Sequence, residues 1–339
     1  MTILVTGGAG YIGSHTCVEL LNNGYKLVVL DKLINSKLES INRVKKITGK
    51  DFIFEHIDLL DKKALERIFS DHKIDAVVHF AGLKAVGESV IKPLDYYRNN
   101  VTGTIVLCEV MQQFDVKNLV VSSSATVYGT AKQMPISEDA PLGVTNPYGR
   151  TKLMVEEILR DIYTSDNNWS IALLRYFNPF GAHKSGQIGE DPNGMPNNLT
   201  TYITQVGIGR LNEVRIFGND YPTKDGTGIR DYIHIIDLAK GHLKALNNVL
   251  NSNGIEAYNL GTGRGYSVLE VIKTFEKTAG ISIPYKVVGR RPGDVAVSYA
   301  DPSKAKRELG WEAEKNLEEM CRDSWNWQKD NLYGYLNKK

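Results

Sequence analysis

Two side chains suited to proton transfer lie four residues apart in the run Asn146–Lys152. Residues four apart share one face of a helix, so Tyr148 and Lys152 would lie side by side there. A neighbouring ammonium favours the phenolate and lowers the pKa of a phenol from its usual value of about 10. The pair therefore predicts a tyrosine that acts as a base, although a half-buried tyrosine beside a surface lysine has the same spacing.

A helix must carry this pair. Pro147 suits the first helical position, because its φ is fixed and its missing N–H is not needed there. Val155, Ile158 and Leu159 then recur at helical spacing. We therefore expect a helix that begins at Pro147 and presents both side chains from its first turns.

A strand, a glycine-rich turn, a helix and a second strand open the chain. Thr2–Thr6 predicts the first strand and Lys26–Leu30 the second, with Gly7, Gly10 and Gly13 after the first. Glycines at this spacing allow a tight turn, let backbone N–H groups approach a pyrophosphate and let the helix pack closely on the strand. This order predicts a dinucleotide site.

The residue that follows the second strand indicates which dinucleotide binds. Asp31 can accept hydrogen bonds from a ribose 2′-OH and would repel a 2′-phosphate, so we expect NAD rather than NADP. The neighbouring Lys32 weakens this discrimination slightly.

Strands and helices continue to alternate, with further strands expected near 52–55, 76–80, 118–121 and 170–175. We expect an α/β fold with a Rossmann doubly wound parallel sheet and a smaller mixed α/β C-terminal substrate-binding region. The predicted boundary separates residues 1–177 from 178–339, with some segments of the second part returning to the sheet. Small and polar residues after two strands predict ligand contacts there.

Composition excludes several other functions. The 339 residues carry a net charge of +2, and the basic pairs are scattered, so we expect neither a nucleic-acid nor a membrane partner. Cys17, Cys108 and Cys321 lie far apart, and the seven histidines show no metal-ligand spacing. With no signal-like N-terminus, the prediction is a cytoplasmic protein without a metal site.

Several longer motifs go beyond the glycine turn and the Tyr148 helix. They are Phe80–Ser89, Ser122–Gly129, Leu174–Asn178, Pro196–Leu199, Phe217–Tyr221 and Gly226–His234. With these motifs the whole chain resembles the UDP-glucose 4-epimerases, which are extended short-chain dehydrogenases/reductases. The resemblance implies a tightly held NAD and a UDP-hexose substrate.

The resemblance also implies roles for individual residues. Tyr148, Lys152 and Ser124 would be catalytic. The implied cofactor-binding residues are Gly7, Gly10, Tyr11, Ile12, Gly13, Asp31, Asn35, Ser36, Asp58, Leu59, Phe80, Ala81, Gly82, Lys84, Asn99, Ser122, Tyr148, Lys152 and Tyr176. The implied substrate-binding residues are Lys84, Ser124, Ala125, Thr126, Tyr148, Phe177, Asn178, Asn198, Leu199, Phe217, Arg230, Tyr232, Arg291, Asp294 and Ser298.

The implied reaction is an epimerisation without net redox change. Tyr148 takes the proton of the sugar 4-hydroxyl while C4 gives its hydride to NAD, the 4-keto sugar rotates, and the hydride returns to the other face. Arg230 and Arg291 would bind the diphosphate, because guanidinium groups match phosphate oxygens in pairs.

Two other functions remain open. A nucleotide-sugar 4,6-dehydratase shares the fold, cofactor and first step, but in that family an Asp-Glu pair follows the strand-end threonine. Here Ala125 and Thr126 follow Ser124, and neither can act as acid or base. A non-catalytic NAD-binding sensor would be expected to have lost the catalytic residues.

Two further expectations concern substrate range and assembly. Ser298 falls where members of the family differ in side-chain size, and a small residue there is associated with N-acetylated UDP-sugars. The alternative is that Tyr299 shifts by one residue and fills the space. The family typically forms dimers through helices such as those near Pro93 and Pro147, and Val101, Ile105 and Cys108 are candidates for that face. The same stripe would also suit packing inside one subunit.

Overall fold

The computed structural model describes residues 1–194, 196, 198–291 and 293–336. Within these residues seven strands form one parallel sheet in the order β10-β6-β5-β4-β1-β2-β3. The strands are β1 (Thr2–Thr6), β2 (Lys26–Leu30), β3 (Ile53–Glu55), β4 (Ala76–His79), β5 (Asn118–Ser124), β6 (Ser170–Tyr176) and β10 (Gly254–Leu260). The predicted Rossmann architecture is confirmed.

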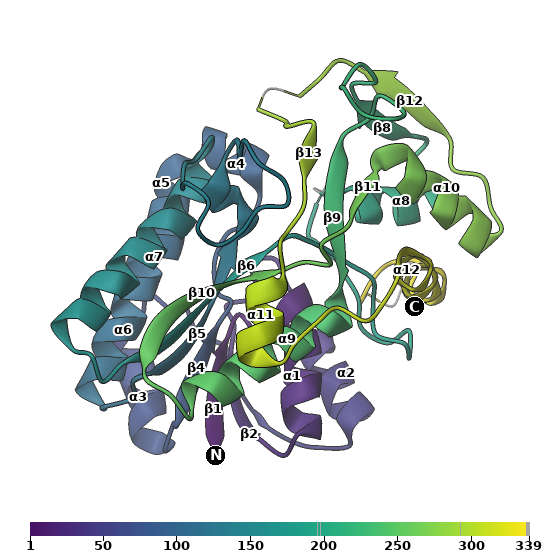
Figure 1. The fold of residues 1–339 in the computed structure, drawn as a ribbon. Coiled ribbons are helices and arrows are strands. Elements are labelled where there is room, and N and C mark those ends of the chain that lie inside the picture. Colours follow the sequence, from purple (N-terminus) through teal and green to yellow (C-terminus); the bar gives the residue numbers. More distant parts are fainter. Residues whose placement is uncertain (195, 197, 292, 337–339) are drawn as a thin grey trace.

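Helices cover both faces of this sheet (Figure 1). One face carries α1 (Tyr11–Asn22), α2 (Leu38–Thr48) and α9 (Ile235–Val249), and the other carries α3 (Lys62–Asp71), α6 (Gly103–Gln113) and α7 (Pro147–Ser165). Side chains of β1 alternate between the two cores, with Ile3 and Val5 in the first and Leu4 in the second. A strand buried on both faces explains why Thr2–Thr6 reads as a continuous apolar run.

The helix predicted from Pro93 is broken into segments. α4 (Val86–Ile91) precedes it, and α5 (Pro93–Tyr96) leads through a π-helical turn over Tyr97–Thr102 into α6. Val101 and Cys108 are buried with the α3 and α7 side chains, and of the predicted stripe only Ile105, at 37% exposure, faces outward. Val101 and Cys108 therefore pack inside the subunit.

The second half of the chain builds a smaller region around short strands. β9 (Ile229–His234) pairs with β7 (Asn178–Phe180), β11 (Gly265–Ser267) and β13 (Val297–Ser298), while β8 (Val214–Phe217) pairs with β12 (Tyr285–Val288). Figure 1 shows these strands beside α8 (Leu199–Gly207), α10 (Val268–Ala279) and α12 (Leu317–Asp330). This region has its own apolar core.

Two segments of the second half join the large sheet. β10 pairs in parallel with β6, and α9 packs on α1 over the same sheet. α11 (Ser303–Leu309) lies against β10 and α9. The large sheet is thus completed by residues far along the chain from its first strand.

β5 is longer than predicted. It runs to Ser124 rather than ending at Val121, because Ser122, Ser123 and Ser124 pair with Leu174, Arg175 and Tyr176 of β6. A 3-10 turn, η2 (Ala125–Tyr128), follows directly. No described helix combines the length and apolar character that a bilayer span requires.

Candidate active site

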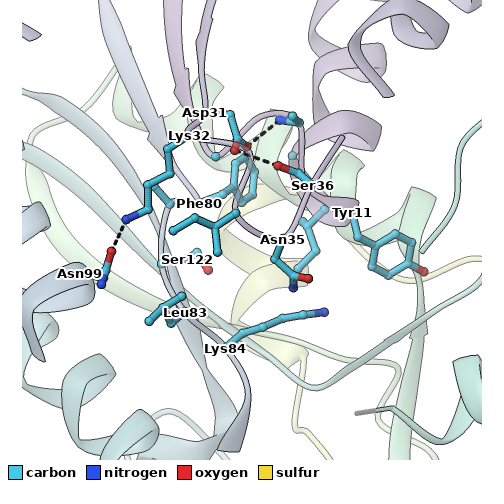
Figure 2. Close-up of a pocket in the computed structure, with 18 of the residues that line it drawn as sticks. Tyr11, Asp31, Lys32, Asn35, Ser36, Phe80, Leu83, Lys84, Asn99 and Ser122 are labelled. Atoms are coloured by element: carbon cyan, nitrogen blue, oxygen red, sulfur yellow. Dashed lines mark hydrogen bonds between the residues drawn. The ribbon is translucent and has the colours of Figure 1, made fainter. Parts of the chain in front are cut away.

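A pocket of about 220 Å³ lies where β1, β2, β4 and β5 end (Figure 2). Ligands of open parallel sheets bind at this edge. Every residue that the resemblance assigns to the cofactor lines this pocket, from Gly7 to Tyr176. The large sheet therefore brings together side chains and backbone from segments that lie far apart in the sequence.

The glycine turn leaves no room for side chains. Gly7 has a φ of +70°, and a Cβ there would lie 2.7 Å from the Ala81 nitrogen. A Cβ on Gly13 would lie 2.4 Å from the Gly7 oxygen. The turn can thus pack against the helix and the end of β4 only as glycine, which fits a backbone cradle for a pyrophosphate.

Asp31 is fixed at the end of β2. One carboxylate oxygen accepts from the backbone nitrogen of Ala9 at 3.1 Å, and the other accepts from Leu33 N and Ser36 Oγ, both at 2.8 Å. The neighbouring Lys32 turns away, since its ammonium lies 3.2 Å from Asp58 and also donates to Asn99. Figure 2 shows the Asp31 carboxylate and the Lys32 ammonium pointing apart. Lys32 is therefore engaged elsewhere and does not neutralise Asp31.

One wall of this pocket was not predicted. Gly189–Pro192 and Tyr335 line it, and they lie far along the chain from the strands. Glu190 forms an ion pair with Lys84 at 2.7 Å, and Asp191 pairs with Lys37. The richness of 180–198 in Gly, Pro and Asn indicates a functional loop, but no local pattern singles out these acidic residues.

Tyr148 and Ser124 are brought together by the start of α7 and the end of β5. Asn146 caps the helix, accepting from Gly149 N at 2.8 Å, and this orients the first turn. Burial raises the pKa of the Tyr148 phenol, and a hydrogen bond with the Ser124 hydroxyl opposes that shift. The phenol therefore has a hydroxyl partner at the pocket wall.

Lys152 makes a contact with the end of β5 that the sequence did not predict. Its ammonium donates to the Ser122 backbone oxygen at 2.6 Å, and burial lowers the pKa of Lys152 to about 8, against an opposing effect of Glu156. Burial raises the pKa of Tyr148, so the lowering of that pKa by Lys152 together with an oxidised cofactor stays a prediction.

A second pocket of about 830 Å³ lies in the smaller region. It is lined by Asn178, Asn198, Leu199, Phe217, Arg230, Tyr232, Arg291 and Asp294 from the predicted substrate set. Unpredicted lining residues include Tyr202, Arg215 and Tyr221.

Two arginines in this second pocket flank one carboxylate. Both guanidinium nitrogens of Arg291 that contact Asp294 lie at 3.1 Å from it, and Arg230 lies 3.8 Å from the same side chain. Arg291 also lies over the Phe217 ring at 5.1 Å. Two cations that share one anion retain an excess of positive charge, which suits a diphosphate.

Glu190, which lines the first pocket, links residues of the two pockets. Its carboxylate accepts from Lys84 of the first pocket at 2.7 Å and from Asn198 of the second at 2.8 Å. One carboxylate therefore joins a residue of the first pocket to a residue of the second. Among the described residues no group of three or more His, Cys, Asp or Glu side chains could hold a metal ion.

Five predicted substrate residues line neither pocket. Ser124, Ala125 and Thr126 lie at the junction of β5 and η2, next to the Tyr148 phenol. The ring of Phe177 packs with Val127 and Tyr128 in a small buried core. The ring therefore does not make the substrate contact that the resemblance implies. Within the quoted motifs, Asn197 is outside the described residues.

Ser298 is the fifth of these residues, and the strand register fixes its direction. It pairs with Arg230, while Asn178 pairs with Tyr232 two residues further along β9. Paired residues of neighbouring strands and residues two apart share a face of a sheet. Ser298 therefore points to the face on which Arg230, Tyr232 and Asn178 line the second pocket.

Comparison with known proteins agrees with this architecture. The family described as GDP-mannose 4,6 dehydratase matches residues 4–324. The UDP-glucose 4-epimerase of Bacillus subtilis is 67% identical over 335 residues, covering 99% of this chain and 99% of that protein.

Two solved structures are similar over nearly the whole chain. The UDP-glucose 4-epimerase of Bifidobacterium longum, in complex with NAD⁺ and UDP, is 55% identical with a TM-score of 0.96, covering 98% of this chain and 100% of that one. The UDP-Glc/GlcNAc 4-epimerase of Campylobacter jejuni is 37% identical with a TM-score of 0.85, covering 97% and 99%. The chain therefore belongs to the UDP-glucose 4-epimerase family.

Proposed function

We propose that this protein interconverts UDP-galactose and UDP-glucose by inverting C4 of the hexose, with a tightly held NAD as transient hydride acceptor. The observation that carries the proposal is the Tyr148 phenol at the wall of the first pocket, with Ser124 beside it and with Glu190 linking this pocket to the arginine-lined second one. Residues 1–177 would hold NAD, and 178–339 would mainly hold the nucleotide sugar.

Asp31 would accept hydrogen bonds from the adenosine ribose, and the glycine turn would hold the pyrophosphate. Bound NAD supplies the hydride acceptor and, in its oxidised form, a positive charge near the phenol. That charge would oppose burial, which raises the pKa of the phenol. Tyr148 would thus become a base when NAD is oxidised and return the proton when NAD is reduced.

In the second pocket Arg230 and Arg291 would bind the diphosphate, with Asp294 fixing their guanidinium groups. Asn178, Asn198, Leu199, Phe217 and Tyr232 would bind the uridine and the adjacent sugar. A substrate tethered by its diphosphate leaves the hexose free to rotate between the two hydride-transfer steps.

A dehydratase needs an acid and a base that remove water from C5 and C6 of the sugar. Ala125 and Thr126 of η2 follow Ser124 at the position where dehydratases carry that pair, and neither side chain can do this chemistry. A sensor without activity would not need the Tyr148–Ser124 contact. Both features favour epimerisation.

The decisive experiment supplies UDP-galactose to the purified protein without added NAD and measures UDP-glucose. We expect turnover with the wild-type protein and none with Tyr148→Phe, which should keep its bound NAD because the ring remains. A near-normal rate in Tyr148→Phe contradicts the assignment. No product from a wild-type protein with NAD bound would favour a sensor.

We further propose that UDP-GlcNAc and UDP-GalNAc interconvert at the same site. Ser298 shares a face with Arg230, and its small side chain leaves room for an acetamido group. The ring of Tyr299 packs near Gly265, which pairs with Asp231 and so lies on the opposite face, where it does not fill that space.

Comparing kcat/KM for the two sugar pairs tests this substrate range. Ser298→Tyr should reduce the value for the acetylated pair by about 100-fold or more and leave the UDP-galactose value within a few-fold, since a tyrosine ring excludes the larger substituent. Absence of acetylated turnover in the parent protein contradicts the hypothesis.

We also propose a cytoplasmic homodimer. Val90, Ile91 and Leu94 of the α4–α5 segment are 63%, 80% and 79% exposed, which is an apolar patch suited to a second copy. All three cysteines are free and buried, as a reducing compartment permits. Light scattering should give twice the chain mass, and Leu94→Glu should give a monomer, while Leu332→Glu on an exposed leucine outside this patch serves as control.

A further inference from the structure

A buried ion pair lies directly behind the Tyr148–Lys152 face of α7. Glu156 follows Lys152 by four residues and so shares that face. Its carboxylate accepts from two guanidinium nitrogens of Arg175 on β6, at 2.6 and 3.0 Å. The two side chains are only 1% and 2% exposed. This is a bidentate pair, which fixes both the distance and the orientation of its partners.

The same carboxylate also holds the strand that carries Ser124. The Ser123 hydroxyl donates a hydrogen bond to Glu156 Oε1 at 2.5 Å. Ser123 also pairs with Arg175 in the β5–β6 register. Its two neighbours are the residues that contact the catalytic pair, because Ser122 accepts from Lys152 and Ser124 contacts Tyr148. One buried carboxylate therefore joins α7, β5 and β6 beside the reaction site.

We propose that Glu156 is a positioning residue for the epimerisation: it keeps Lys152 cationic and holds α7 against β5 so that Tyr148 stays on Ser124. The inference rests on the proposed function. A lysine that loses its proton would lose its role as a charged partner for the cofactor ribose and the phenolate. A helix that shifts by part of a turn would separate the phenol from its hydroxyl partner.

The groups around Lys152 explain why this carboxylate matters. Tyr148 and Glu156 lie one turn before and one turn after Lys152 on α7. The Ser122 carbonyl of β5 accepts from the ammonium, and His79 of β4 interacts with it electrostatically. Tyr176 of β6 is a neutral phenol. His79 is neutral at pH 7, because burial lowers its pKa to about 3. Among the described residues, Glu156 is the charged group that raises the pKa of Lys152 and so opposes the loss of its proton, while the Arg175 cation paired with Glu156 on β6 partly offsets that effect.

The test is the pH dependence of kcat in Glu156→Gln. We expect kcat to fall about 10-fold or more near pH 8, and the alkaline limb of the profile to move about one pH unit lower, since a charge one helical turn away has an effect of that order. The NAD content of the purified variant, measured after denaturation, should equal that of wild type. Glu156→Asp keeps the charge and should leave the limb in place while kcat falls at unchanged KM.

Tyr128→Phe is the matched control. It removes the hydroxyl that accepts from Arg175 at 2.9 Å within the same buried network, but it keeps the ion pair. We expect a lower melting temperature and an unmoved limb. If Glu156→Gln does not fold, the double variant Glu156→Gln/Arg175→Gln leaves no uncompensated buried charge. It should still lower kcat at unchanged KM, because the bonds that hold α7 against β5 and β6 are lost.

The proposal would be overturned if Glu156→Gln folds with a lower melting temperature but keeps the wild-type kcat and the wild-type limb. The Glu156–Arg175 pair would then only stabilise the fold. The proposed function fails by a different result, namely a wild-type protein that holds NAD but does not convert UDP-galactose.

Discussion

The Lys152 ammonium and the Ser122 carbonyl oxygen lie 2.6 Å apart. This contact ties the catalytic helix α7 to the end of β5 and places a cation in a site where only 9% of the lysine is exposed. The chain therefore keeps a buried charge at the edge of its largest sheet, where burial lowers the pKa of Lys152 to about 8 from its usual value of 10.5.

Replacing this lysine should separate activity from stability. Lys152→Met should lower kcat by about 10²- to 10⁴-fold, as expected for loss of a group that supports proton transfer. The pKa of Lys152 is lower in the folded state than in the unfolded state, so the buried charge destabilises the wild-type protein at pH 7. This destabilisation, about 3 kcal/mol in the free energy of unfolding, is relieved as pH rises from about 8 to 10.5.

The measurement is the free energy of unfolding of wild type and Lys152→Met across that pH range. The advantage of Lys152→Met over wild type should be largest below pH 8 and shrink as pH rises. Lys26→Met, on an exposed lysine at the start of β2, should show no such trend. A constant difference between Lys152→Met and wild type would contradict the buried-charge interpretation.

The sequence predicted most of the first pocket because its determinants are local. The spacing of Gly7, Gly10 and Gly13 specifies a turn between one strand and one helix, and Asp31 ends the next strand, so short-range patterns suffice. The family resemblance then named further residues, such as Asn35, Asn99 and Tyr176, all of which lie at this pocket.

What the sequence did not predict depends on long-range packing. Glu190, Asp191 and Tyr335 reach the pocket from segments whose position is set by the whole fold, so no neighbouring residue signals their role. The spacing of Tyr148 and Lys152 fixes a common helix face but not which way a flexible lysine turns. Lys152 turns to a carbonyl oxygen that the extension of β5 to Ser124 presents.

Asp191 should slow the loss of NAD. Its carboxylate pairs with Lys37, beside the Asn35–Ser36 wall, and accepts from Tyr335 N at 2.8 Å, which holds Gly189–Pro192 across the pocket. Asp191→Asn leaves Lys37 without its partly buried partner, a loss of about 1–2 kcal/mol, so NAD should dissociate about 10-fold faster.

The measurement is the time course of NAD release from the purified holoenzyme during dialysis. Asp51→Asn is the control, because Asp51 also pairs with a lysine, Lys45, but is 86% exposed and lies away from the pocket. Equal release rates for Asp191→Asn and wild type would show that this segment does not retain the cofactor.

Asp31 should set the preference for NAD over NADP. Its carboxylate is fixed by Ala9, Leu33 and Ser36, and Lys32 is held by Asp58 and Asn99, so the negative charge at this end of the pocket is not neutralised. Asp31→Asn removes the charge that repels a 2′-phosphate and should raise the NADP-to-NAD affinity ratio about 10- to 100-fold. Reconstitution of the cofactor-free protein with each dinucleotide measures this ratio; an unchanged ratio assigns the discrimination to another group.

His15 should make the protein sensitive to acid. It is fully buried on α1, where Nδ1 lies 2.7 Å from the Tyr11 carbonyl oxygen and Nε2 has no partner among the described residues. Burial lowers the pKa of His15 to about 3. Below about pH 6.5 the unfolded chain therefore binds a proton at His15, whereas the folded protein binds it only below about pH 3. The free energy of unfolding falls as pH falls through this window.

His15→Gln keeps a donor for the Tyr11 carbonyl and removes the proton-binding group. The slope of the free energy of unfolding against pH should therefore decrease by about 1.4 kcal/mol per pH unit between pH 4 and 6. His56→Gln, on an exposed histidine, is the matched control and should keep the wild-type slope. If His15→Gln and wild type lose stability with the same slope, His15 already carries a proton in the folded state. The acid sensitivity would then have to come from other buried groups, such as His79 and His242, whose pKa values burial also lowers.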